Sequence, residues 1–461
     1  MTVALSLPRE RAGALSWVAA FVFGEVLDVK VRIVPTDANQ VLLEMDGKQL
    51  ALASEFPPGD DVWPTRKDMP RQPLAVWRGA ILPELKIRDL PILFGAPGLK
   101  SSSDGNRVEC NVDVLGSIFF MLSRFEEIAT GERDRHDRFP ASASLALKES
   151  FLLRPIVDEL IELLWASMAR LWPTLKRRVS EGRMRISCDV DKPFDQVGRS
   201  ASRLVFAVAR DALLLRKPRR ATFRTINFFL SRRRNLKFDP YYNFDWYMDT
   251  CEHAGHRVTF HFICGHSGGS LDGTYNIYEP RIISLIRRIH ERGHEVNLHA
   301  SYNTFRDPVQ LGVELLALQS AMRTASIEES PKGNRQHYLR WDAACTPDHL
   351  QDIGVEIDSS GGFADHIGFR FGTSREFPMW SWKKHVALSL RQRPLIAMDT
   401  SIFDAKYMQV ATKQDALQLV LEMRDVSTRY GGDFNLLWHN DDLFGIAERR
   451  LFVDILSSKR P

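Results

Sequence analysis

The sequence predicts an α/β protein with a mainly parallel sheet, preceded by a smaller α+β domain. The 461 residues are too many for one ordinary core, so two domains are expected. The pattern changes near residue 182, and from residue 257 strand-like segments alternate with helical ones, as in β/α units. Polar residues collect at the ends of these strands, where such folds carry their chemistry.

Composition narrows the class of protein. Hydrophobic residues make up 44% of the chain and charged residues 26%, the balance of a soluble globular protein. The net charge of +4 is small for this length and identifies no class of partner. The cysteine count of 5 is odd, and no pair has C-x-x-C spacing, which favours a reducing compartment over a disulfide framework. We therefore expect a cytoplasmic protein.

Residues 1–180 are predicted to form the α+β accessory domain. Strand-like segments at 29–35 and 40–46 are followed, after a proline-rich stretch, by helical segments at 112–130 and 154–173. The apolar segment that follows Arg9 is interpreted as an amphipathic helix rather than a signal peptide, because Glu25 interrupts it and no cleavage site follows. No apolar run reaches the roughly 18 residues that a membrane span needs.

Residues 181–461 are predicted to form the second domain, with a basic insertion at about 199–240. A short strand ends in acidic residues near 189, before that insertion. The later strands and helices follow in turn, at 257–265, 279–293, 294–300, 308–325, 336–342, 354–360 and 434–440. This order favours a parallel sheet whose strand ends share one edge.

Asp189 and Asp191 close the first of these strands. Two residues apart on an extended strand, their carboxylates point the same way and repel unless they share a cation or a proton. A bound metal would satisfy this arrangement, and so would an exposed turn that leaves both side chains in water. The spacing leaves both interpretations open.

Histidines follow two other strands. His299 could ligate a metal through a neutral imidazole, and Asn303, four residues later, could add a weaker oxygen ligand. His439 follows the apolar run FNLLW and could act as a general acid. Taken singly, each histidine could equally be a hydrogen-bonded structural residue.

Together, these segments resemble the motifs of the polysaccharide deacetylase (NodB-homology, carbohydrate esterase family four) superfamily. The resemblance covers about residues 182–445 and rests on the order of SCDVDKP, LHASYNT, RQHYLRWD, IDSSGG and LLWHN. The phrases ILFGAPG and LGSIFFMLSRFEE are similar to those of a bacterial branch with an extra N-terminal domain. The resemblance implies a distorted (β/α) barrel for the second domain.

The resemblance also implies roles for individual residues. Asp189 would be the general base, paired with Arg340, and His439 the general acid. Asp191 and His299 would bind a divalent metal, zinc being the first expectation, with cobalt, nickel and manganese also compatible. Asn303 stands where the family usually has a second histidine, so it is the third expected ligand. The expected substrate-binding residues are Tyr302, Asp358, His366 and Arg370.

The function implied is a metal-dependent hydrolase that removes an acetyl group from an N-acetylated or O-acetylated sugar of a surface polysaccharide or its lipid-linked precursor. A glycan-binding protein without catalysis is one alternative, suggested by Asn303. A glycosyltransferase is another, because Asp189-Val190-Asp191 is also a D-x-D pattern. That second alternative leaves His299, Arg340 and His439 unexplained.

The basic insertion is the remaining sequence feature that could contact a partner. Lysines and arginines are interleaved with apolar residues between 210 and 237. They are Arg210, Arg216, Lys217, Arg219, Arg220, Arg224, Arg232, Arg233, Arg234 and Lys237. Such a segment could meet the inner face of a membrane or a lipid-linked glycan, or be a solvated helical insertion. No nucleic-acid-binding motif is present, so nucleic acid is not an expected partner.

Overall fold

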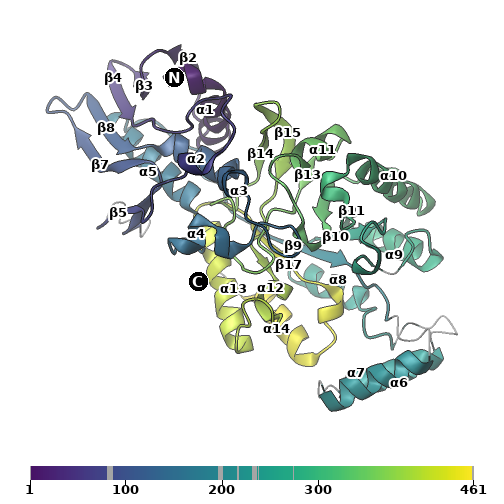
Figure 1. Ribbon diagram of the computed structural model, residues 1–461. Helices are drawn as coiled ribbons and strands as arrows, with labels where there is room; N and C mark the ends of the chain where they lie inside the picture. Colours follow the sequence, from purple (N-terminus) through teal and green to yellow (C-terminus); the bar gives the residue numbers. More distant parts are fainter. Residues whose placement is uncertain are drawn as a thin grey trace. The chain divides into compact units, whose positions relative to one another are not determined.

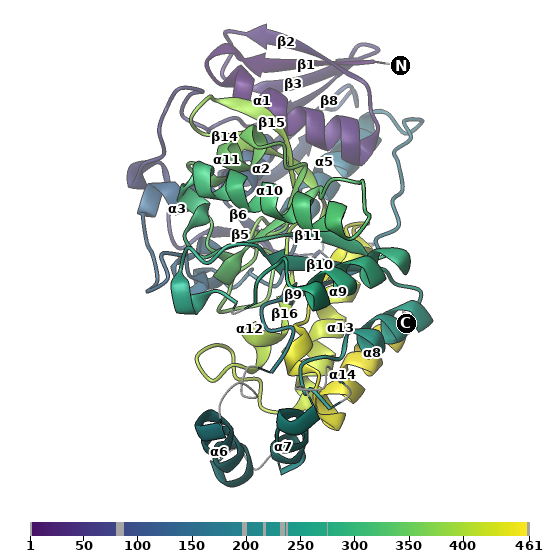
Figure 2. The same cartoon turned by 90° about the vertical axis from the view of Figure 1, so that its right-hand side faces the viewer.

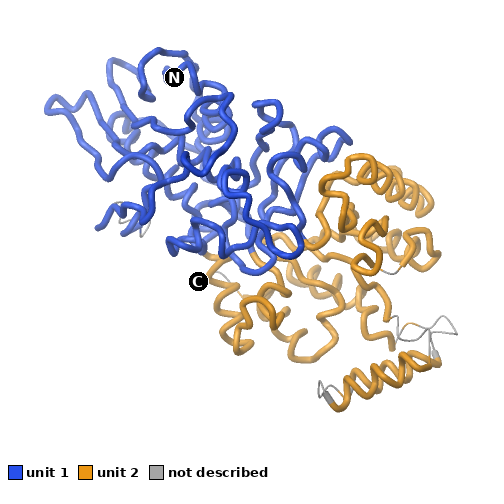
Figure 3. The backbone as a smooth tube through the Cα atoms, viewed as in Figure 1, with its two compact units in different colours: residues 1–183, 339–396, 426–434 blue, residues 184–338, 397–425, 435–461 orange. Residues whose placement is uncertain are grey.

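The computed structural model describes residues 2–79, 87–195, 201–214, 218–230, 236, 238–273 and 275–458 (Figure 1). Contacts between residues divide the chain into two units (Figure 3). The first unit comprises residues 1–183, 339–396 and 426–434, and the second comprises 184–338, 397–425 and 435–461. The chain is therefore of mixed α/β class, with each unit built from separate stretches of sequence.

The first unit contains a six-stranded mixed sheet in the order β2-β1-β3-β4-β8-β7. Its strands are β1 (Val3–Pro8), β2 (Val31–Thr36), β3 (Val41–Met45), β4 (Lys48–Leu52), β7 (Gly95–Ser101) and β8 (Arg107–Val112). A separate antiparallel pair is formed by β5 (Ala75–Trp77) and β6 (Leu90–Ile92). Alternate residues of β1 are buried, as expected for a strand with one face on the core.

The helix predicted at the N-terminus is present in the first unit. It consists of a 3-10 turn (Arg9–Arg11), α1 (Ala12–Ala19) and a π-helical stretch (Ala20–Leu27). It ends at Asp28, which adopts the left-handed conformation that commonly terminates helices. Its apolar side chains are buried, so the segment belongs to the folded core.

The helix predicted over 112–130 is two helices, α2 (Val114–Leu122) and α3 (Phe125–Thr130). Asp113 caps α2 by accepting a hydrogen bond from the amide of Gly116 at 2.8 Å. The break falls at Arg124, whose φ of 55° is left-handed. Its guanidinium is buried and bonds to Glu126 and Glu127. This ion pairing favours the break over one continuous helix.

Later segments of the chain complete the first unit. Besides α4 (Leu145–Lys148) and α5 (Ile156–Leu171), it holds α11 (Thr346–Asp352), β13 (Ile357–Asp358), β14 (Phe377–Ser381) and β15 (Val386–Gln392). Trp17 donates its indole N–H to the carbonyl of Pro378 at 3.0 Å, and its ring lies 5.4 Å from that of Trp380. These contacts explain why residues 339–396 fold with the N-terminal segment.

The second unit contains strands in the order β12-β11-β10-β9-β17-β16. Their bounds are β9 (Met184–Val190), β10 (Val258–Ile263), β11 (Glu295–Ala300), β12 (Gly333–Gln336), β16 (Ala397–Met398) and β17 (Phe434–Leu437). The pairs β9–β10, β10–β11, β11–β12 and β16–β17 are parallel. The expected parallel arrangement is therefore found, and the carboxyl ends of these strands share one edge.

Helices surround these strands. They are α6 (Ala201–Ala209), α7 (Pro218–Leu230), α8 (Phe244–His253), α9 (Pro280–Glu291), α10 (Pro308–Thr324), α12 (Asp399–Phe403), α13 (Lys413–Arg429) and α14 (Ile446–Ser457). In α9, Ile282, Ile286 and Ile289 are buried at helical spacing, which explains its amphipathic sequence. Within the part of the chain that the structure describes, no helix is long and apolar enough to cross a membrane.

Candidate metal centre

Three strands of one parallel sheet bring the candidate ligands together. Asp191 follows β9, His299 lies in β11, and His337 follows β12 directly. Since β9, β10, β11 and β12 are adjacent in the sheet, their carboxyl ends present these side chains at one edge. Asp191 and His299 were predicted as ligands, whereas His337 was not singled out.

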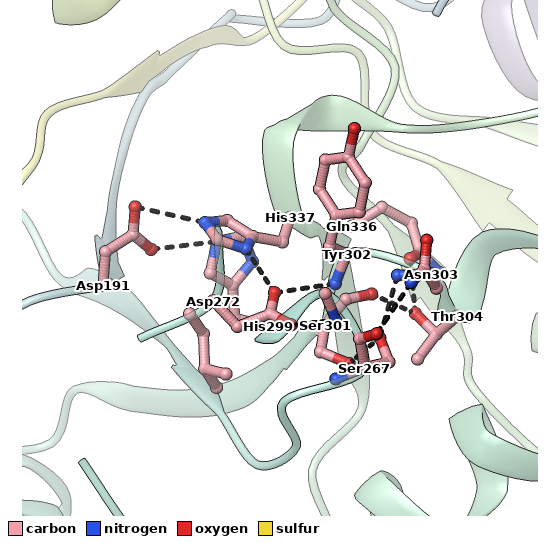
Figure 4. Close-up of polar contacts among 12 residues, drawn as sticks. Asp191, Ser267, Asp272, His299, Ser301, Tyr302, Asn303, Thr304, Gln336 and His337 are labelled. Carbon is pink, nitrogen blue, oxygen red and sulfur yellow. Dashed lines mark hydrogen bonds and ion pairs between the residues drawn. The ribbon is translucent and has the colours of Figure 1, made fainter. Parts of the chain in front are cut away.

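These three side chains form a compact group (Figure 4). One ligand atom from each lies within 4.8 Å of the others. Nε2 of His299 lies 3.2 Å from Oδ1 of Asp191, and Nε2 of His337 lies 3.5 Å from its Oδ2. Ligand atoms of a tetrahedral zinc site, each about 2.0–2.2 Å from the ion, would be about 3.4 Å apart. The spacing fits an ion of that size.

The protonation of the group also fits a cation. Nδ1 of His299 lies 2.9 Å from the carbonyl oxygen of Arg335, so Nδ1 carries the proton. Nε2 of the same ring therefore faces Asp191. Oδ1 of Asp191 is buried and accepts no hydrogen bond from any residue that the structure describes. A cation or a proton held between Nε2 and this carboxylate would satisfy both atoms.

His337 is oriented by a buried carboxylate. Its Nδ1 lies 2.8 Å from Oδ1 of Asp272, which leaves Nε2 directed at Asp191. The backbone amides of Gly268 and Tyr302 also donate to Asp272 and fix it in place. A Cβ at Gly268 would lie 2.5 Å from that of Tyr302, so this close approach requires glycine.

The same carboxylates determine the charge of His337. Burial favours the neutral imidazole, but Asp191 and Asp272 outweigh it and raise the pKa of His337 to about 9. Burial likewise disfavours the ionised form of Asp191, yet His337 and His299 hold the pKa of that carboxyl well below its usual range. The ligand group thus keeps an ionised carboxylate in a buried setting.

Asp189 lies beside the ligand group. Its carboxylate points toward the same imidazole as that of Asp191, with Oδ2 3.7 Å from Nε2 of His299, as strand alternation predicted. On its other side, Oδ1 lies 3.6 Å from Nε of Arg335 and 3.2 Å from Nδ1 of His261. Burial raises the pKa of Asp189, but Arg335 and the two histidines outweigh it and hold that pKa below its usual range. Asp189 is therefore an ionised, almost fully buried base.

His261 is a site residue that the sequence did not indicate. It lies in β10 directly opposite Asp189 in the strand register. Burial lowers the pKa of His261 to about 4, so the ring is neutral at neutral pH and contacts Asp189 as a neutral imidazole. The sequence signal for His261 is a polar residue inside the apolar run VTFHFI. Pairing of this strand with the neighbouring β9 places His261 beside Asp189.

His439 also lies near Asp191. Its Nε2 is 4.0 Å from Oδ2 of Asp191, and its Nδ1 is 2.8 Å from Oδ1 of Asp399. The backbone amide of His439 also donates to Asp399 at 2.6 Å. Burial disfavours the imidazolium, but Asp399 outweighs it and raises the pKa of His439 well above its ordinary value. The next residue, Asn440, is buried and anchors this loop by donating to the carbonyl of Lys192 at 3.0 Å.

Asn303 lies outside the ligand group, contrary to expectation. Its side chain is exposed and donates to the carbonyl of Ser267 at 2.7 Å, and its amide donates to the hydroxyl of the same serine. Ser267 in turn contacts Ser301, whose amide donates to buried Glu314. Figure 4 shows Asn303 in this network, apart from Asp191. Asn303 thus holds a loop, and His337 is the third candidate ligand.

The guanidinium beside Asp189 comes from a different arginine than the one expected. Arg340 was predicted to pair with the base, but Arg335 occupies that position. Arg340 belongs to the first unit, where Nε donates to the carbonyl of His136 at 2.8 Å. Arg335 lies in β12, opposite His299 in the register, so its place follows from strand pairing.

Three of the expected substrate-binding residues also belong to the first unit. Arg370 is 2% exposed, and its guanidinium bonds to both carboxylate oxygens of Glu127. Asp358 is fully buried and accepts from the amide and hydroxyl of Ser360. His366 is half-buried, with Nδ1 3.0 Å from the carbonyl of Ile367. The contacts of Arg370 and Asp358 are those of structural core residues.

Tyr302, the fourth expected substrate-binding residue, lies near the ligand group. Its half-buried ring is 5.3 Å from that of Tyr338, which in turn lies 4.7 Å from the imidazole of His337. Tyr338 has a φ of 61°, a left-handed conformation that is uncommon for an aromatic residue and often marks functional sites. The two tyrosines form an aromatic wall beside the candidate ligands.

The basic insertion is only partly described. Arg216, Lys217, Arg232, Arg233, Arg234, Lys237 and the side chain of Arg219 lie outside the described residues. Arg224 is buried and donates to Asp195 at 2.9 Å and to Asp211 at 2.6 Å. Arg220 bonds to the hydroxyl of Tyr241. Two of the predicted surface charges therefore serve to hold α7 in place.

Comparison with known proteins adds little that identifies the chain. Residues 5–173 match the model of a family of unknown function (DUF7033). No curated protein matches the sequence. A crystal structure described as a "putative polysaccharide deacetylase" from Mycobacterium smegmatis aligns over 61% of this chain and 84% of its own, with a TM-score of 0.39 and 13% identity.

Proposed function

We propose that the protein is a metal-dependent hydrolase that removes an acetyl group from an N-acetylated or O-acetylated sugar. The substrate would be a surface polysaccharide or its lipid-linked precursor, and the second unit would be a distorted (β/α) barrel. The observation that carries the proposal is the group Asp191, His299 and His337, with both imidazoles oriented by acceptors at Nδ1. Two nitrogen ligands and one carboxylate leave a coordination position open, as catalytic zinc sites do.

Asp191, His299 and His337 would hold the ion. A divalent metal there would polarise the acetyl carbonyl and lower the pKa of a bound water. Zinc suits these borderline ligands, although the same donors accept cobalt, nickel or manganese. The ligands come from separate strands of one sheet, and Asp272 supports His337 from behind, which keeps the group in position before substrate arrives.

Asp189 would act as the general base. It is ionised, buried and directed toward the ligand group, so it can take the proton of the attacking water. Arg335 and His261 fix its orientation and offset the cost of burying its charge. Arg335 takes the role that the resemblance had assigned to Arg340.

His439 would act as the general acid. Its Nε2 lies 4.0 Å from Oδ2 of Asp191, and Asp399 keeps it protonated at neutral pH. The imidazolium can therefore donate a proton to the leaving amine or alcohol of the sugar. Tyr302 and Tyr338 provide an apolar, hydroxyl-bearing surface suited to packing against a sugar ring.

The alternatives lose their support in this geometry. The case for a glycan-binding protein without catalysis rested on Asn303, and His337 supplies the ligand that Asn303 does not. The case for a glycosyltransferase required both carboxylates of the D-x-D pattern at a nucleotide-bound metal. Asp189 is instead enclosed by Arg335, His261 and His299.

Metal content and acetate release test the proposal together. The purified full-length chain is stripped with a chelator, reloaded with zinc, cobalt, nickel or manganese, and assayed on 4-nitrophenyl acetate and acetylated chito-oligosaccharides. We expect one equivalent of metal, metal-dependent acetate release, and loss of both in Asp191→Ala. Asn303→Ala serves as the matched control and retains its metal. A wild-type chain that binds none of the four ions and releases no acetate would refute the proposal.

A further inference from the structure

Two helices of the second unit form a hairpin. They are α6 and α7, joined through a π-helical turn (Arg210–Leu214), and they lie side by side (Figures 1 and 2). Leu204 and Ala207 of α6 are buried, as are Ala221 and Phe228 of α7, so these side chains form the inner face of the hairpin.

The hairpin is fixed at its base by charge. Arg224 of α7 donates to Asp211, at the end of α6, and to Asp195, which follows β9. Both carboxylates are buried with the guanidinium. Buried groups paired in this way hold the hairpin in one orientation, since separating them would leave charges unpaired. Its outer face is therefore presented by a fixed structure.

The outer face of α6 and of the π-helical turn that follows it is apolar and exposed. Val205, Phe206 and Leu213 are exposed to 69%, 73% and 81%. Val205, Ala209 and Leu213 follow at four-residue steps and so share one side of the helix, with Phe206 next to them. A contiguous set of large exposed apolar side chains marks an interaction surface more often than it marks ordinary protein surface.

Positive charge borders one side of this face. Arg203 and Arg210 are exposed, and their seven-residue spacing places them together along one margin of the apolar stripe. Residues 201–237 contain eleven lysines and arginines and one acidic residue, Asp211, which is buried against Arg224. The local charge is thus strongly positive in a chain whose net charge is only +4.

We infer that this face of α6 and the following π-helical turn, defined by Val205, Phe206, Ala209 and Leu213, docks on an anionic lipid bilayer. An apolar stripe bordered by arginines is the pattern of a helix that lies in the membrane interface, where apolar side chains enter the acyl boundary and cations meet lipid phosphates. A second copy of the chain fits less well, because a symmetric contact would bring Arg203 and Arg210 of both copies together. The inference goes beyond the proposed hydrolase activity and does not depend on it.

Vesicle binding tests the inference. The full-length protein is sedimented with vesicles of phosphatidylcholine and phosphatidylglycerol (7:3) and with pure phosphatidylcholine vesicles. We expect binding to the anionic vesicles, weakened by salt, and a fall of at least about tenfold in the partition coefficient for the Phe206→Ser, Leu213→Ser double variant. Phe206→Trp should show blue-shifted fluorescence and quenching by brominated lipid on the same vesicles.

The matched control lies in the same unit. Val313 and Leu316 of α10 are exposed to 55% and 62%, and no lysine or arginine lies between residues 307 and 322. Val313→Ser, Leu316→Ser should bind vesicles within about twofold of the wild type. Equal binding by the Phe206→Ser, Leu213→Ser variant, or no binding by the wild type at low salt, would overturn the inference. A dimer that this variant abolishes would assign the face to a second copy instead.

Discussion

Nδ1 of His337 lies 2.8 Å from Oδ1 of Asp272, while Nε2 of the same ring faces Asp191 at 3.5 Å. One imidazole thus joins a supporting carboxylate to a ligand carboxylate. In metal sites, a carboxylate behind a histidine fixes the tautomer and raises the basicity of the coordinating nitrogen. Asp272 therefore holds His337 in the orientation that a metal ligand needs. The first three predictions follow from this arrangement.

Replacing His337 should remove the metal, whereas replacing Asn303 should not. His337→Ala leaves one nitrogen ligand and one carboxylate. Zinc affinity is therefore expected to fall by more than about 100-fold, which exceeds the loss typical when a residue that only supports a ligand is replaced. Asn303→Ala removes the side-chain bond to Ser267, outside the ligand group, and should bind zinc within a few-fold of the wild type. Isothermal titration of the stripped proteins measures both. The opposite ranking would restore Asn303 as the ligand.

Replacing Asp272 with asparagine should weaken the site without emptying it. The amide keeps the shape of the side chain but removes the charge that supports His337, so we expect a 10- to 100-fold loss of zinc affinity, the usual effect of such a partner. Asp307→Asn, at the exposed N-cap of α10, removes the same charge and provides the control. Unchanged zinc affinity in Asp272→Asn would show that the hydrogen bond does not tune the site.

Metal affinity should rise with pH. The folded-state pKa of His337, about 9, lies above its ordinary value of 6.5, so its proton stabilises the metal-free fold below pH 6.5, and this contribution is lost as the pH rises through 9. A metal needs the neutral ring and displaces that proton, which gives about tenfold tighter binding per pH unit until the pH approaches the pKa. Competition with a chromophoric chelator at several pH values measures the slope. His337→Ala, which lacks this proton, should lose that part of the slope.

Arg335 should control the protonation of Asp189. In Arg335→Ala the carboxylate stays buried but loses its main cation, so its pKa rises and the acid limb of the pH–rate profile moves to higher pH. Arg335→Lys should restore part of the shift. Arg340→Ala, which loses contacts to His136, should leave that limb in place. A shift produced by Arg340→Ala and not by Arg335→Ala would reverse the assignment.

His439 should affect turnover without affecting metal binding. His439→Ala removes the proton donor, and general acid catalysis typically contributes about 10²- to 10⁴-fold, so kcat should fall in that range. Its Nε2 lies 4.0 Å from Asp191 and outside the ligand group, so bound metal should stay at the wild-type level. Loss of metal together with activity would make His439 a ligand.

Part of the centre was predictable from strand geometry alone. Alternation placed Asp189 and Asp191 on one side of β9, and His299 followed from the end of an apolar strand. His337 was missed because HYLRWD was taken as one continuous strand. The chain instead leaves β12 at Gln336 and turns at Tyr338, whose left-handed φ no sequence pattern announced.

The arginine that pairs with Asp189 was misassigned for a related reason. Arg335 and Arg340 are five residues apart, and only the register of β12 against β11 decides which one faces Asp189. The division of the chain into two units also could not be predicted from local sequence patterns. Trp17 meets Pro378 and Trp380, and such long-range packing draws residues 339–396 to the N-terminal segment. Tertiary contacts of this kind leave no local periodicity.

The second unit is assembled from three separate stretches, and this affects the order in which a ribosome could complete it. Asp191, His299 and His337 all belong to the first stretch, whereas Asp399 and His439 come from the two later ones. Strand β17, which neighbours β9 in the sheet, is also synthesised well after it. A growing chain therefore carries all three candidate ligands before it carries the proposed acid, so ion capture could precede completion of the proposed catalytic set.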